Sequence, residues 1–310
     1  MTVELVVPRE AGGERLDRFV AEHASVGSRA AAARLIDAGA VVVDGEVRPR
    51  AHRVAAGAVV VLTVPEPVQA PLPDEDVEVV HADERLLVVV KPAGLLVHGV
   101  PGHGGPTLAA ALAGRAGGGP PGRAGIVHRL DRDTSGVLIV AKKRGALTGL
   151  HAQLRDGAID KRYDVLVRGK WRDALRRIEL PLTSYVTGEG ERRVRVDPAG
   201  RLARTIVRSA KVWPKAEPAQ ALLEAELETG RTHQIRVHLA HIGFPLAGDD
   251  KYGDFTWNKA LAREGLKRMF LHARRICFAH PVDGREVTVE APLAPELASY
   301  VARLDALAGA

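Results

Sequence analysis

The pattern of apolar residues in the first 65 positions predicts a small α+β unit. Leu16, Phe19 and Val20 recur at helical spacing, and an alanine-rich stretch follows with the same period. Beyond it, a run of three valines at 41–43 precedes the pair Asp44–Gly45, a dipeptide typical of a tight hairpin turn, and Glu46–Val47 follow it. The predicted order is helix, helix, hairpin and strand, over residues 14–23, 28–38, 41–47 and 58–64.

Short apolar runs bounded by turn residues dominate the rest of the chain and predict strands. Helical periodicity is confined to residues 147–155 and 232–241. Because strands outnumber helices without a regular βαβ alternation, we expect an α+β body around a mixed, mostly antiparallel sheet. The predicted strands span residues 86–90, 137–141, 163–167, 203–207, 221–227 and 287–291.

A proline-rich acidic segment separates these two regions. Four prolines and seven acidic side chains fall between residues 65 and 84, where there is no lysine or arginine. Proline disfavours helix and central strand alike. We therefore expect a small N-terminal domain over residues 1–65, a linker over 66–76 and a larger domain over 77–310.

The charge distribution indicates a polyanionic partner. The net charge is +6, but residues 85–310 alone carry 36 basic and 23 acidic side chains. Such an excess is typical of a surface that attracts nucleic acid. An arginine-rich composition without a binding role would produce the same excess, so charge alone leaves both explanations open.

Composition argues against several classes of protein. A hydrophobic fraction of 46% and a charged fraction of 26% are those of a globular chain, and no uncharged apolar run reaches the length of a membrane-spanning helix. The first residues lack the basic and apolar regions of a signal peptide. The single cysteine, Cys277, argues against an internal disulfide and against metal sites built from several thiolates, so we expect a reducing cytoplasm.

Polar groups cluster directly before a predicted strand, in the segment HRLDRDTSG at residues 128–136. A polar cluster at such a place is typical of the rim of a cleft. Asp131 and Asp133 invite comparison with the carboxylate pair of a glycosidase, but two positions apart on an extended chain they point to opposite sides. Asp133 and Thr134 are better explained as residues that brace a tight turn. Asp131 and Arg129 are less well explained in that way and are the candidates for chemistry.

This segment resembles the signature of the RluA-type pseudouridine synthases. Four further segments resemble motifs of that family in the expected order, and together they cover about residues 77–297. The region 13–65, with GERLDRF near its head, resembles the S4 RNA-binding domain. The four segments are KPAG at 91–94, KRY at 161–163, TGRTHQIRVHLAH at 229–241 with GDDKYG at 248–253, and LHA at 271–273 with HP at 280–281.

The resemblance implies isomerisation of uridine to pseudouridine in RNA. The reaction has no net redox or hydrolytic step, so no cofactor and no metal are expected. GERRVRVD at 190–197 and GDDKYGDF at 248–255 most resemble the branch of the family that acts on the ribosomal large subunit, so 23S ribosomal RNA is the expected substrate of a monomeric enzyme, with transfer RNA as the alternative. Two departures from the family pattern, Phe244 in place of His and Val90 in place of Asn, bear on substrate preference.

The same resemblance implies roles for individual residues. Asp131 has the position of the family's reactive aspartate, which acts on the sugar or the base by a route that the sequence leaves open. Tyr163 has the position on which a flipped uracil stacks, its hydroxyl being available for the C5 proton, and Leu271 lies on the other side of the base. Arg236 is the expected cationic partner of Asp131, with Arg231 as the alternative. Further substrate contacts are expected from Arg129, Arg231 and His128.

Arg129 has the position of the side chain that fills the gap left by the flipped base, and its guanidinium plane suits both stacking and phosphate binding. His128 is expected to contact RNA or backbone rather than to act as a general base. The histidines of residues 229–241 lack a cysteine or carboxylate that would complete a metal site, so structural roles are expected for them. In the S4-like region, contacts to RNA phosphates are expected from Arg29, Arg34, Arg48, Arg50 and Arg53.

Two other functions fit parts of the sequence. One is an RNA-binding assembly factor with an inactive synthase fold. The presence of Asp131, Tyr163 and Arg236 together argues against it, because a decayed site usually loses one such residue. The other is a glycosidase-like hydrolase that uses Asp131 and Asp133, which would release free uracil.

Overall fold

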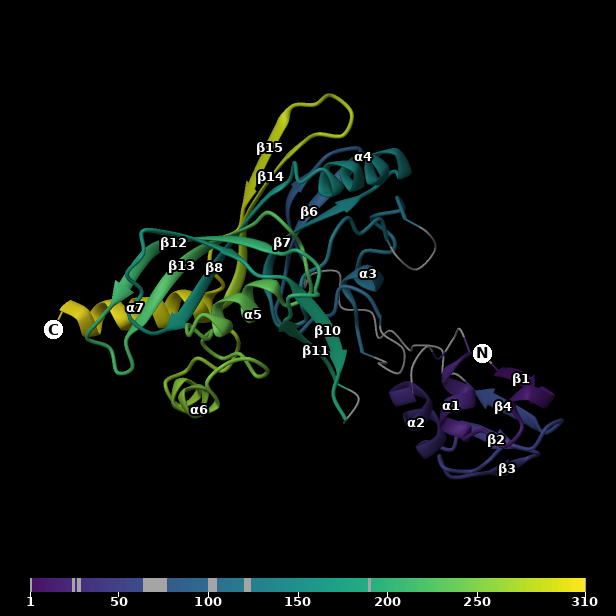
Figure 1. Cartoon of the computed structure of the whole chain (residues 1–310). Coiled ribbons are helices and arrows are strands. Elements are labelled where there is room, and N and C mark those ends of the chain that lie inside the picture. The colour runs from purple at the N-terminus through teal and green to yellow at the C-terminus, as the bar shows by residue number, and fades with distance from the viewer. Residues whose placement is uncertain are drawn as a thin grey trace. The chain divides into compact units, whose positions relative to one another are not determined.

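The computed structural model describes residues 2–23, 26, 29–63, 77–99, 105–119, 124–188 and 191–309. The chain forms two compact units, one within its first 70 residues and a larger one that holds the bulk of the rest (Figure 1). No helix among the described residues is long and apolar enough to cross a membrane. The predicted linker at 66–76 lies outside the described residues, so the predicted domain limits stay predictions.

The N-terminal unit combines two helices with a four-stranded antiparallel sheet of order β1-β4-β2-β3. Asp44 and Gly45 have positive φ angles of 49° and 82°, the backbone of a type I′ turn, which confirms the hairpin predicted for this dipeptide. The elements are β1 (Thr2–Val6), η1 (Arg9–Ala11), α1 (Leu16–Ala21), α2 (Arg29–Asp37), β2 (Val41–Val43), β3 (Glu46–Val47) and β4 (Val59–Thr63).

Strand β1 and the short helix η1, which precede the first predicted element, are not predicted by the sequence pattern. The five residues of β1 alternate between exposed and half-buried positions, and none of its side chains is fully buried. This strand pairs with β4 from Thr2 opposite Thr63 to Val6 opposite Val59. Helices α1 and α2 contribute Leu16, Val20 and Leu35 to a small apolar core, which is separate from the core of the larger unit.

The larger unit is built on a nine-stranded sheet of order β5-β6-β7-β14-β8-β13-β12-β9, with β15 paired to β14. Among its described strand pairs, β7 with β14 alone is parallel, which confirms the predicted mixed, mostly antiparallel α+β fold. The strands are β5 (Glu78–Ala82), β6 (Leu86–Lys91), β7 (Ser135–Ala141), β8 (Asp160–Arg168), β9 (Leu175–Glu179), β12 (Arg204–Trp213), β13 (Gln220–Leu227), β14 (Leu271–Ala279) and β15 (Glu286–Glu290).

Helices and a two-stranded ribbon, β10 with β11, complete this unit. Helix α4 packs on β7, α7 on β12, and α5 on β11 and β12. The predicted helices at 147–155 and 232–241 correspond to α4, which begins three residues earlier, and α5, which begins two residues later. The bounds are β10 (Leu182–Val186), β11 (Arg192–Val196), α3 (Leu108–Ala111), α4 (Arg144–Arg155), α5 (Gln234–His241), α6 (Phe255–Arg263) and α7 (Pro295–Gly309).

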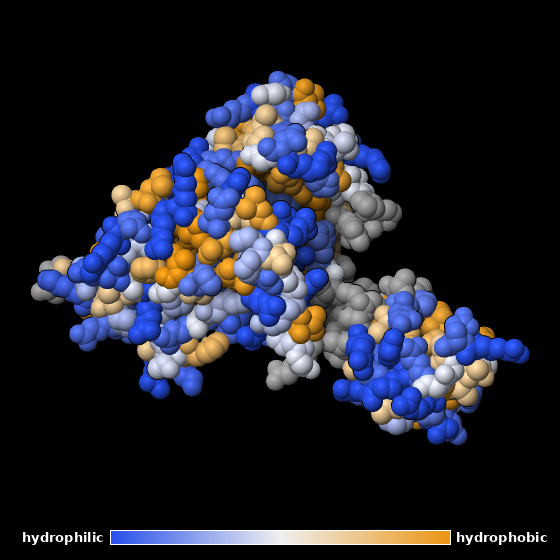
Figure 2. All heavy atoms as spheres, viewed as in Figure 1, coloured by the Kyte–Doolittle hydropathy of each residue, from blue (hydrophilic) through white to orange (hydrophobic). Residues whose placement is uncertain are grey.

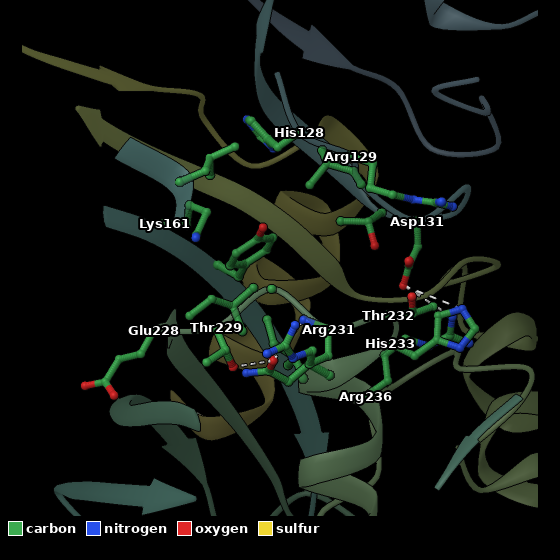
Figure 3. A pocket seen from close by; sticks show the side chains of 18 of the residues that line it. His128, Arg129, Asp131, Lys161, Glu228, Thr229, Arg231, Thr232, His233 and Arg236 are labelled. Atoms are coloured by element: carbon green, nitrogen blue, oxygen red, sulfur yellow. Dashed lines mark hydrogen bonds and ion pairs between the residues drawn. The ribbon is translucent and has the colours of Figure 1, made fainter. Parts of the chain in front are cut away.

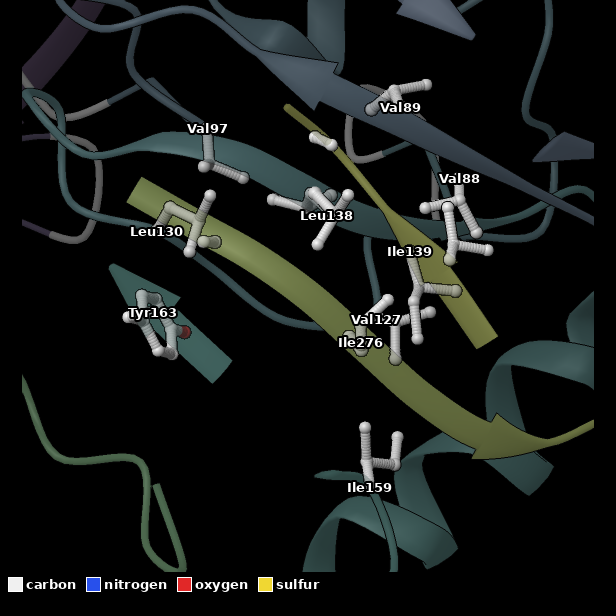
Figure 4. Close-up of a cluster of buried hydrophobic side chains, with 14 of the residues drawn as sticks. Val88, Val89, Val97, Val127, Leu130, Leu138, Ile139, Ile159, Tyr163 and Ile276 are labelled. Atoms are coloured by element: carbon white, nitrogen blue, oxygen red, sulfur yellow. The ribbon is translucent and has the colours of Figure 1, made fainter. Parts of the chain in front are cut away.

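A buried apolar cluster supports the centre of the sheet. Every residue of β7 is buried, and its Leu138 and Ile139 join Val88 and Val89 of β6 in this cluster (Figure 4). On the outside, hydrophilic side chains cover most of the visible face of each unit, with smaller apolar patches between them (Figure 2). The segment HRLDRDTSG leads directly into β7, so the rigid core holds its end in place.

Strand β14 brings three distant motifs together. It lies between β7 and β8, and its Ala273 is opposite both Gly136 of β7 and Tyr163 of β8. Leu271, the first residue of β14, therefore lies beside the loop that precedes β7 and beside the strand that carries Tyr163. The sequence pattern marks only residues 271–273 as a motif and does not predict this strand.

Gly136 makes the close approach of β7 and β14 possible. Its φ is 117°, and a β-carbon at this position would lie 2.2 Å from the carbonyl oxygen and 2.6 Å from the amide nitrogen of Ala273. Both the backbone angle and the available space therefore require glycine.

Gly136→Ala is expected to lower the free energy of unfolding by at least about 2 kcal/mol, because the strands must separate to admit a methyl group. The matched control is Gly145→Ala in α4, where a β-carbon meets nothing within 4 Å. The control should be as stable as wild type or more stable by up to about 1 kcal/mol. Urea unfolding measures both, and equal stability of Gly136→Ala and wild type would contradict the packing argument.

Candidate active site

A cavity of about 480 Å³ lies beside the loop that precedes β7 (Figure 3). Its lining comes from that loop, the end of α4, the start of β8, the segment that joins β13 to α5 together with the first residues of α5, and the first residue of β14. The structure therefore brings together all the residues to which the sequence assigns catalysis or substrate contact in this unit. These are His128, Arg129, Asp131, Tyr163, Arg231, Arg236 and Leu271.

Asp131 presents a partly accessible carboxylate to this cavity, with 22% of its side chain exposed. The backbone around it is held by a turn, in which the amide of Thr134 donates to the carbonyl oxygen of Asp131 at 3.2 Å. Two groups face the same carboxylate oxygen, Oδ2: Nη1 of Arg236 at 3.6 Å and Nε2 of His233 at 3.9 Å. The carboxylate is thus flanked by positive and polar groups without being enclosed by them.

Nη1 of Arg236 lies 3.6 Å from Oδ2 of Asp131, but the main partner of Arg236 is a different carboxylate. Its Nε and Nη2 donate to the two oxygens of Asp249 at 2.7 and 2.6 Å, and Nη2 also reaches Asp250 at 3.2 Å. Arg236 is 3% exposed and Asp249 is fully buried. Arg231, the alternative partner, instead donates from Nε to the carbonyl oxygen of Leu202 at 3.1 Å.

Arg236 and Asp249 form a buried ion pair in which both side chains stay charged. Burial disfavours both charges, but the hydrogen bonds and the charge of Asp249 outweigh it and raise the pKa of Arg236. Burial likewise acts against a charged Asp249, yet hydrogen bonds from Arg236 and from the backbone of Lys251 and Tyr252 hold its pKa below the usual range. The sequence contained one signal for this pair, the GDD of residues 248–250, but did not show which carboxylate the arginine would meet.

Tyr163 and Leu271 form the apolar part of the cavity. Tyr163 is 6% exposed, and Leu271 is 4% exposed. Burial, reinforced by the negative charge of Asp131, raises the pKa of Tyr163 above its ordinary value, so the hydroxyl stays protonated at neutral pH. An aromatic ring and a leucine at one cavity suit a flat base, as the sequence motifs suggested.

His128 contacts backbone. Its Nε2 accepts a hydrogen bond from the amide of Ile139 at 3.2 Å. Burial, with a smaller effect of the charge of Lys161, lowers the pKa of His128 to about 3, so the imidazole is neutral. His128 is therefore a neutral hydrogen-bond acceptor for the backbone of β7, which is one of the roles expected from the sequence. Its Nε2 has no lone pair left to take a proton from substrate.

The cavity is basic. Arg129 is exposed at its lining, and further arginine and lysine side chains line it together with Glu228 and Asp131 as the acidic ones. Burial lowers the pKa of Lys161, and the charge of Asp160 opposes this. Lys161 entered the sequence analysis only as part of a motif, although it is a cavity residue. The cationic lining residues are Arg129, Arg155, Lys161, Arg231 and Arg236.

Asp133 does not share the cavity with Asp131. It is absent from the lining and forms an ion pair with its neighbour Arg132, whose Nε lies 3.1 Å from Oδ1. The geometry therefore does not support a glycosidase-like pair of carboxylates. It fits the interpretation of Asp133 as a residue of the turn before β7.

His238 of α5 and His233, which directly precedes this helix, are held by their neighbours. His238 is buried between Oγ1 of Thr205, 2.9 Å from Nδ1, and the carbonyl oxygen of Leu180, 3.0 Å from Nε2. This is the structural role predicted for it. Nδ1 of His233 lies 2.8 Å from the hydroxyl of Tyr252. Among the described residues, no group of three or more histidine, cysteine or acidic side chains has the arrangement of a metal site.

The arginines expected to contact RNA in the N-terminal unit also have partners within the protein. Arg29 pairs with Asp17 at 2.9 Å and Arg48 with Glu46 at 2.6 Å. The side chain of Arg34 lies outside the described part of the chain. Arg50 pairs with Asp37, and Arg53 donates to the carbonyl oxygen of Gly13. The side chains of Arg29, Arg48 and Arg50 remain 43–61% exposed and are therefore accessible to phosphates.

Lys91 stabilises the loop that precedes β7 through hydrogen bonds to backbone carbonyl oxygens. It is fully buried, and its Nζ donates to the carbonyl oxygens of Pro92, Leu95 and Arg132 at 2.7, 2.9 and 2.9 Å. Burial lowers the pKa of Lys91 to about 7, and the charge of Asp133 partly opposes this. One side chain thus ties the KPAG turn to the residue that follows Asp131.

Lys91 predicts a pH-dependent stability. Between its native pKa of about 7 and its unfolded value of 10.5, the unfolded chain binds more protons at this site, so the stability that Lys91 contributes rises with pH. The difference in unfolding free energy between wild type and Lys91→Met should grow from pH 6.5 to 9.5 by up to about 1.4 kcal/mol per pH unit. Urea unfolding at both pH values measures it. Lys259→Met, at an exposed position, is the control. If the difference in unfolding free energy from wild type were independent of pH for both variants, the prediction would be refuted.

Comparison with known proteins gives two family matches. The family described as RNA pseudouridylate synthase matches residues 85–241, and the S4 domain matches residues 14–60. The chain is 36% identical over 312 residues to the ribosomal large subunit pseudouridine synthase C of Pasteurella multocida, covering 97% of this chain and 93% of that protein. It is 38% identical over 307 residues to the protein of that name from Yersinia pestis, covering 94% and 92%.

Solved structures give the same fold. The chain superposes on human RNA pseudouridylate synthase domain containing 1 with a TM-score of 0.58 at 24% identity, over 76% of this chain and 97% of that one. For human RNA pseudouridylate synthase domain containing 4, the TM-score is 0.57 at 23% identity, over 74% and 93%. The names of the curated relatives agree with the resemblance of the segments 190–197 and 248–255 to the ribosomal large subunit synthase C group.

Proposed function

The chain belongs to the RNA pseudouridylate synthase family, and we propose that it isomerises uridines to pseudouridine in ribosomal large subunit RNA. The observation that carries the proposed site is the placement of Asp131, Arg236 and Tyr163 around one basic cavity. The names of the relatives support the ribosomal substrate, and transfer RNA is the alternative within the same reaction class.

Asp131 is the proposed reactive group. The glycosidic bond to uracil must break and the base must rotate before a carbon–carbon bond forms to the same ribose. A carboxylate promotes this by attacking C1′, by adding to C6 or by removing a ribose proton. All three routes need an accessible carboxylate oxygen next to the substrate, and Asp131 offers one in the cavity, with Nη1 of Arg236 at 3.6 Å from its Oδ2.

Tyr163 and Leu271 are the proposed holders of the base. A uracil flipped out of a helix loses its stacking partners, and contact with the Tyr163 ring and Leu271 would replace part of that loss. The hydroxyl of Tyr163 is proposed to relay the proton that C5 of the rotated base loses: its oxygen accepts that proton while its own hydrogen passes to solvent, because the raised pKa of Tyr163 disfavours a free phenolate. The uracil is thereby held within reach of Asp131.

The basic lining is proposed to bind the RNA backbone. Arg129 is exposed and lies two residues before Asp131, which suits it to enter the gap left by the flipped nucleotide while it contacts a phosphate. Arg231 is proposed to contact the substrate as well, and His128 acts by bracing the loop. RNA is thus the partner of both units of the chain, and we expect a monomer that works in the cytoplasm.

Mapping of pseudouridines tests the function. RNA from cells that lack the protein should lose pseudouridine at specific sites of large subunit ribosomal RNA, and wild-type protein should restore them while Asp131→Asn should not. Loss at transfer RNA sites would assign the alternative substrate. An unchanged pseudouridine content in both RNA classes would refute the enzymatic function and favour a silent assembly factor.

The N-terminal arginines predict a salt effect. If Arg48 and Arg50 contact phosphates, the double variant Arg48→Gln/Arg50→Gln should flatten the slope of log affinity against log salt by about 1.4–1.8, or about 0.7–0.9 per contact. Filter binding to a ribosomal RNA fragment measures this slope. The control is Arg303→Gln on α7, which removes one positive charge from the other unit. An unchanged slope for the double variant would remove these arginines from the RNA interface.

A further inference from the structure

His233 has an unusual backbone for its residue type. Its φ of 53° and ψ of 21° lie in the left-handed region, and among the described residues only Asp44 and Ala124 share a positive φ without being glycine. Asp44 belongs to a hairpin turn that requires this conformation, whereas His233 immediately precedes α5. Strain of this kind persists where the surroundings impose it, and it is concentrated at functional sites. Here it accompanies an imidazole that points toward Asp131 (Figure 3).

Tyr252 holds the other side of the imidazole. Its hydroxyl oxygen lies 2.8 Å from Nδ1 of His233 and accepts the amide hydrogen of Val194 in β11 at 2.8 Å. Burial raises the pKa of Tyr252 to about 12, so the hydroxyl keeps its hydrogen. With Val194 donating to the oxygen, the arrangement that satisfies every group has the hydroxyl hydrogen directed at Nδ1, which is then the acceptor.

An accepting Nδ1 places the proton of the neutral imidazole on Nε2. Burial lowers the pKa of His233, with the charge of Asp131 opposing it, so the neutral form persists to a lower pH than for an ordinary histidine. The Nε2–H group then faces Oδ2 of Asp131 at 3.9 Å, and Arg236 faces the same oxygen at 3.6 Å. In the described part of the chain, no hydrogen bond restrains Oδ1, the other carboxylate oxygen of Asp131.

We propose that His233 is a positioning residue, fixed in its Nε2–H tautomer by the hydroxyl of Tyr252, which orients Asp131 so that Oδ1 faces the bound uridine. This inference rests on the proposed role of Asp131. Distances just beyond hydrogen-bond length are common in empty active sites and shorten when the substrate is bound. The hydroxyl of Tyr252 thereby links the β10–β11 ribbon, through Val194, to the reactive carboxylate.

The tautomer is measured on the full-length protein alone. Long-range ¹H–¹⁵N correlation at pH 8 should show His233 with Nε2 protonated, its signals being assigned by their loss in His233→Asn, since asparagine tolerates a left-handed backbone. Tyr252→Phe removes only the hydroxyl and keeps the ring. The centroid of this ring lies 5.5 Å from the centroid of the His233 ring and 5.2 Å from Cζ of Arg236. In that variant a substantial population with Nδ1 protonated should appear.

Kinetics supply the second readout. On a ribosomal RNA fragment, Tyr252→Phe should lower kcat about tenfold with KM within about twofold, as expected for one hydrogen bond that acts through a neighbour. His233→Asn should lower kcat at least as much. Tyr300→Phe is the matched control, because its buried hydroxyl contacts Gln220 and Glu264 away from the cavity, and neither readout should move.

Three results would overturn the inference: a wild-type His233 protonated on Nδ1, a tautomer shift in Tyr252→Phe without a change in kcat, or full activity of His233→Asn. The tautomer is read without RNA. A wild-type protein that forms no pseudouridine would therefore overturn the proposed function, while the spectrum still decides whether Tyr252 fixes His233.

Discussion

Asp131→Asn is expected to lower pseudouridine formation by at least about 10³-fold, while the affinity for RNA stays within about twofold of wild type. An amide is neither a nucleophile nor a base, so each of the three chemical routes open to the carboxylate is lost. RNA affinity arises mainly from contacts to phosphates, to which Asp131 contributes none. Single-turnover kinetics with mass spectrometric detection of pseudouridine, together with filter binding, measure both quantities.

Asp133→Asn is the matched control for this prediction. It lies two residues away in the same loop, pairs with Arg132 and does not line the cavity, so it should keep turnover within about tenfold of wild type. Residual turnover of Asp131→Asn within tenfold of wild type would remove Asp131 from the mechanism. Equal losses in both variants would mean that the loop, and not the individual carboxylate, is being perturbed.

Arg236→Met is expected to lower the free energy of unfolding by about 3–5 kcal/mol, because it leaves the fully buried carboxylate of Asp249 without its partner. Arg231→Met is the control, since Arg231 donates to a backbone carbonyl and is only half-buried. Its loss should change the unfolding free energy by less than about 1 kcal/mol. Urea unfolding of the two variants gives both values.

Two double-mutant cycles identify which carboxylate Arg236 serves. Coupling with Asp249→Asn should be strong, at about 2–3 kcal/mol, because the two side chains share buried hydrogen bonds. Coupling with Asp131→Asn should stay below about 1 kcal/mol in stability, because that carboxylate is partly exposed and 3.6 Å away. Additive effects in the first cycle would show that the ion pair with Asp249 is not what makes Arg236 important for folding.

Local sequence patterns were sufficient for several parts of this protein. The helices of the N-terminal unit and its hairpin at Asp44–Gly45 follow from short-range periodicity and from the positive φ that the turn requires. The polar segment 128–136 was recognisable as the rim of a cleft by its place before a strand, whereas the segment 229–241 was joined to it only by the family resemblance, and the cavity residues Arg155 and Glu228 were not predicted. In such segments the interacting residues are neighbours in the chain, so the local sequence determines their relative positions.

Contacts between distant segments were not contained in these patterns. Asp131, Asp249 and Asp250 are equivalent partners for Arg236 in the sequence, and the fold alone desolvates Asp249 and closes the bidentate pair. Strand β14 enters the sheet between β7 and β8, which brings Leu271 to the cavity; sequence periodicity says nothing about which strands become neighbours. The burial of Lys91 has the same origin, since its three carbonyl partners include Arg132, 41 residues further along the chain. Burial and strand order depend on the packing of the whole chain, and this packing determines which charges lose their water and which side chains face each other.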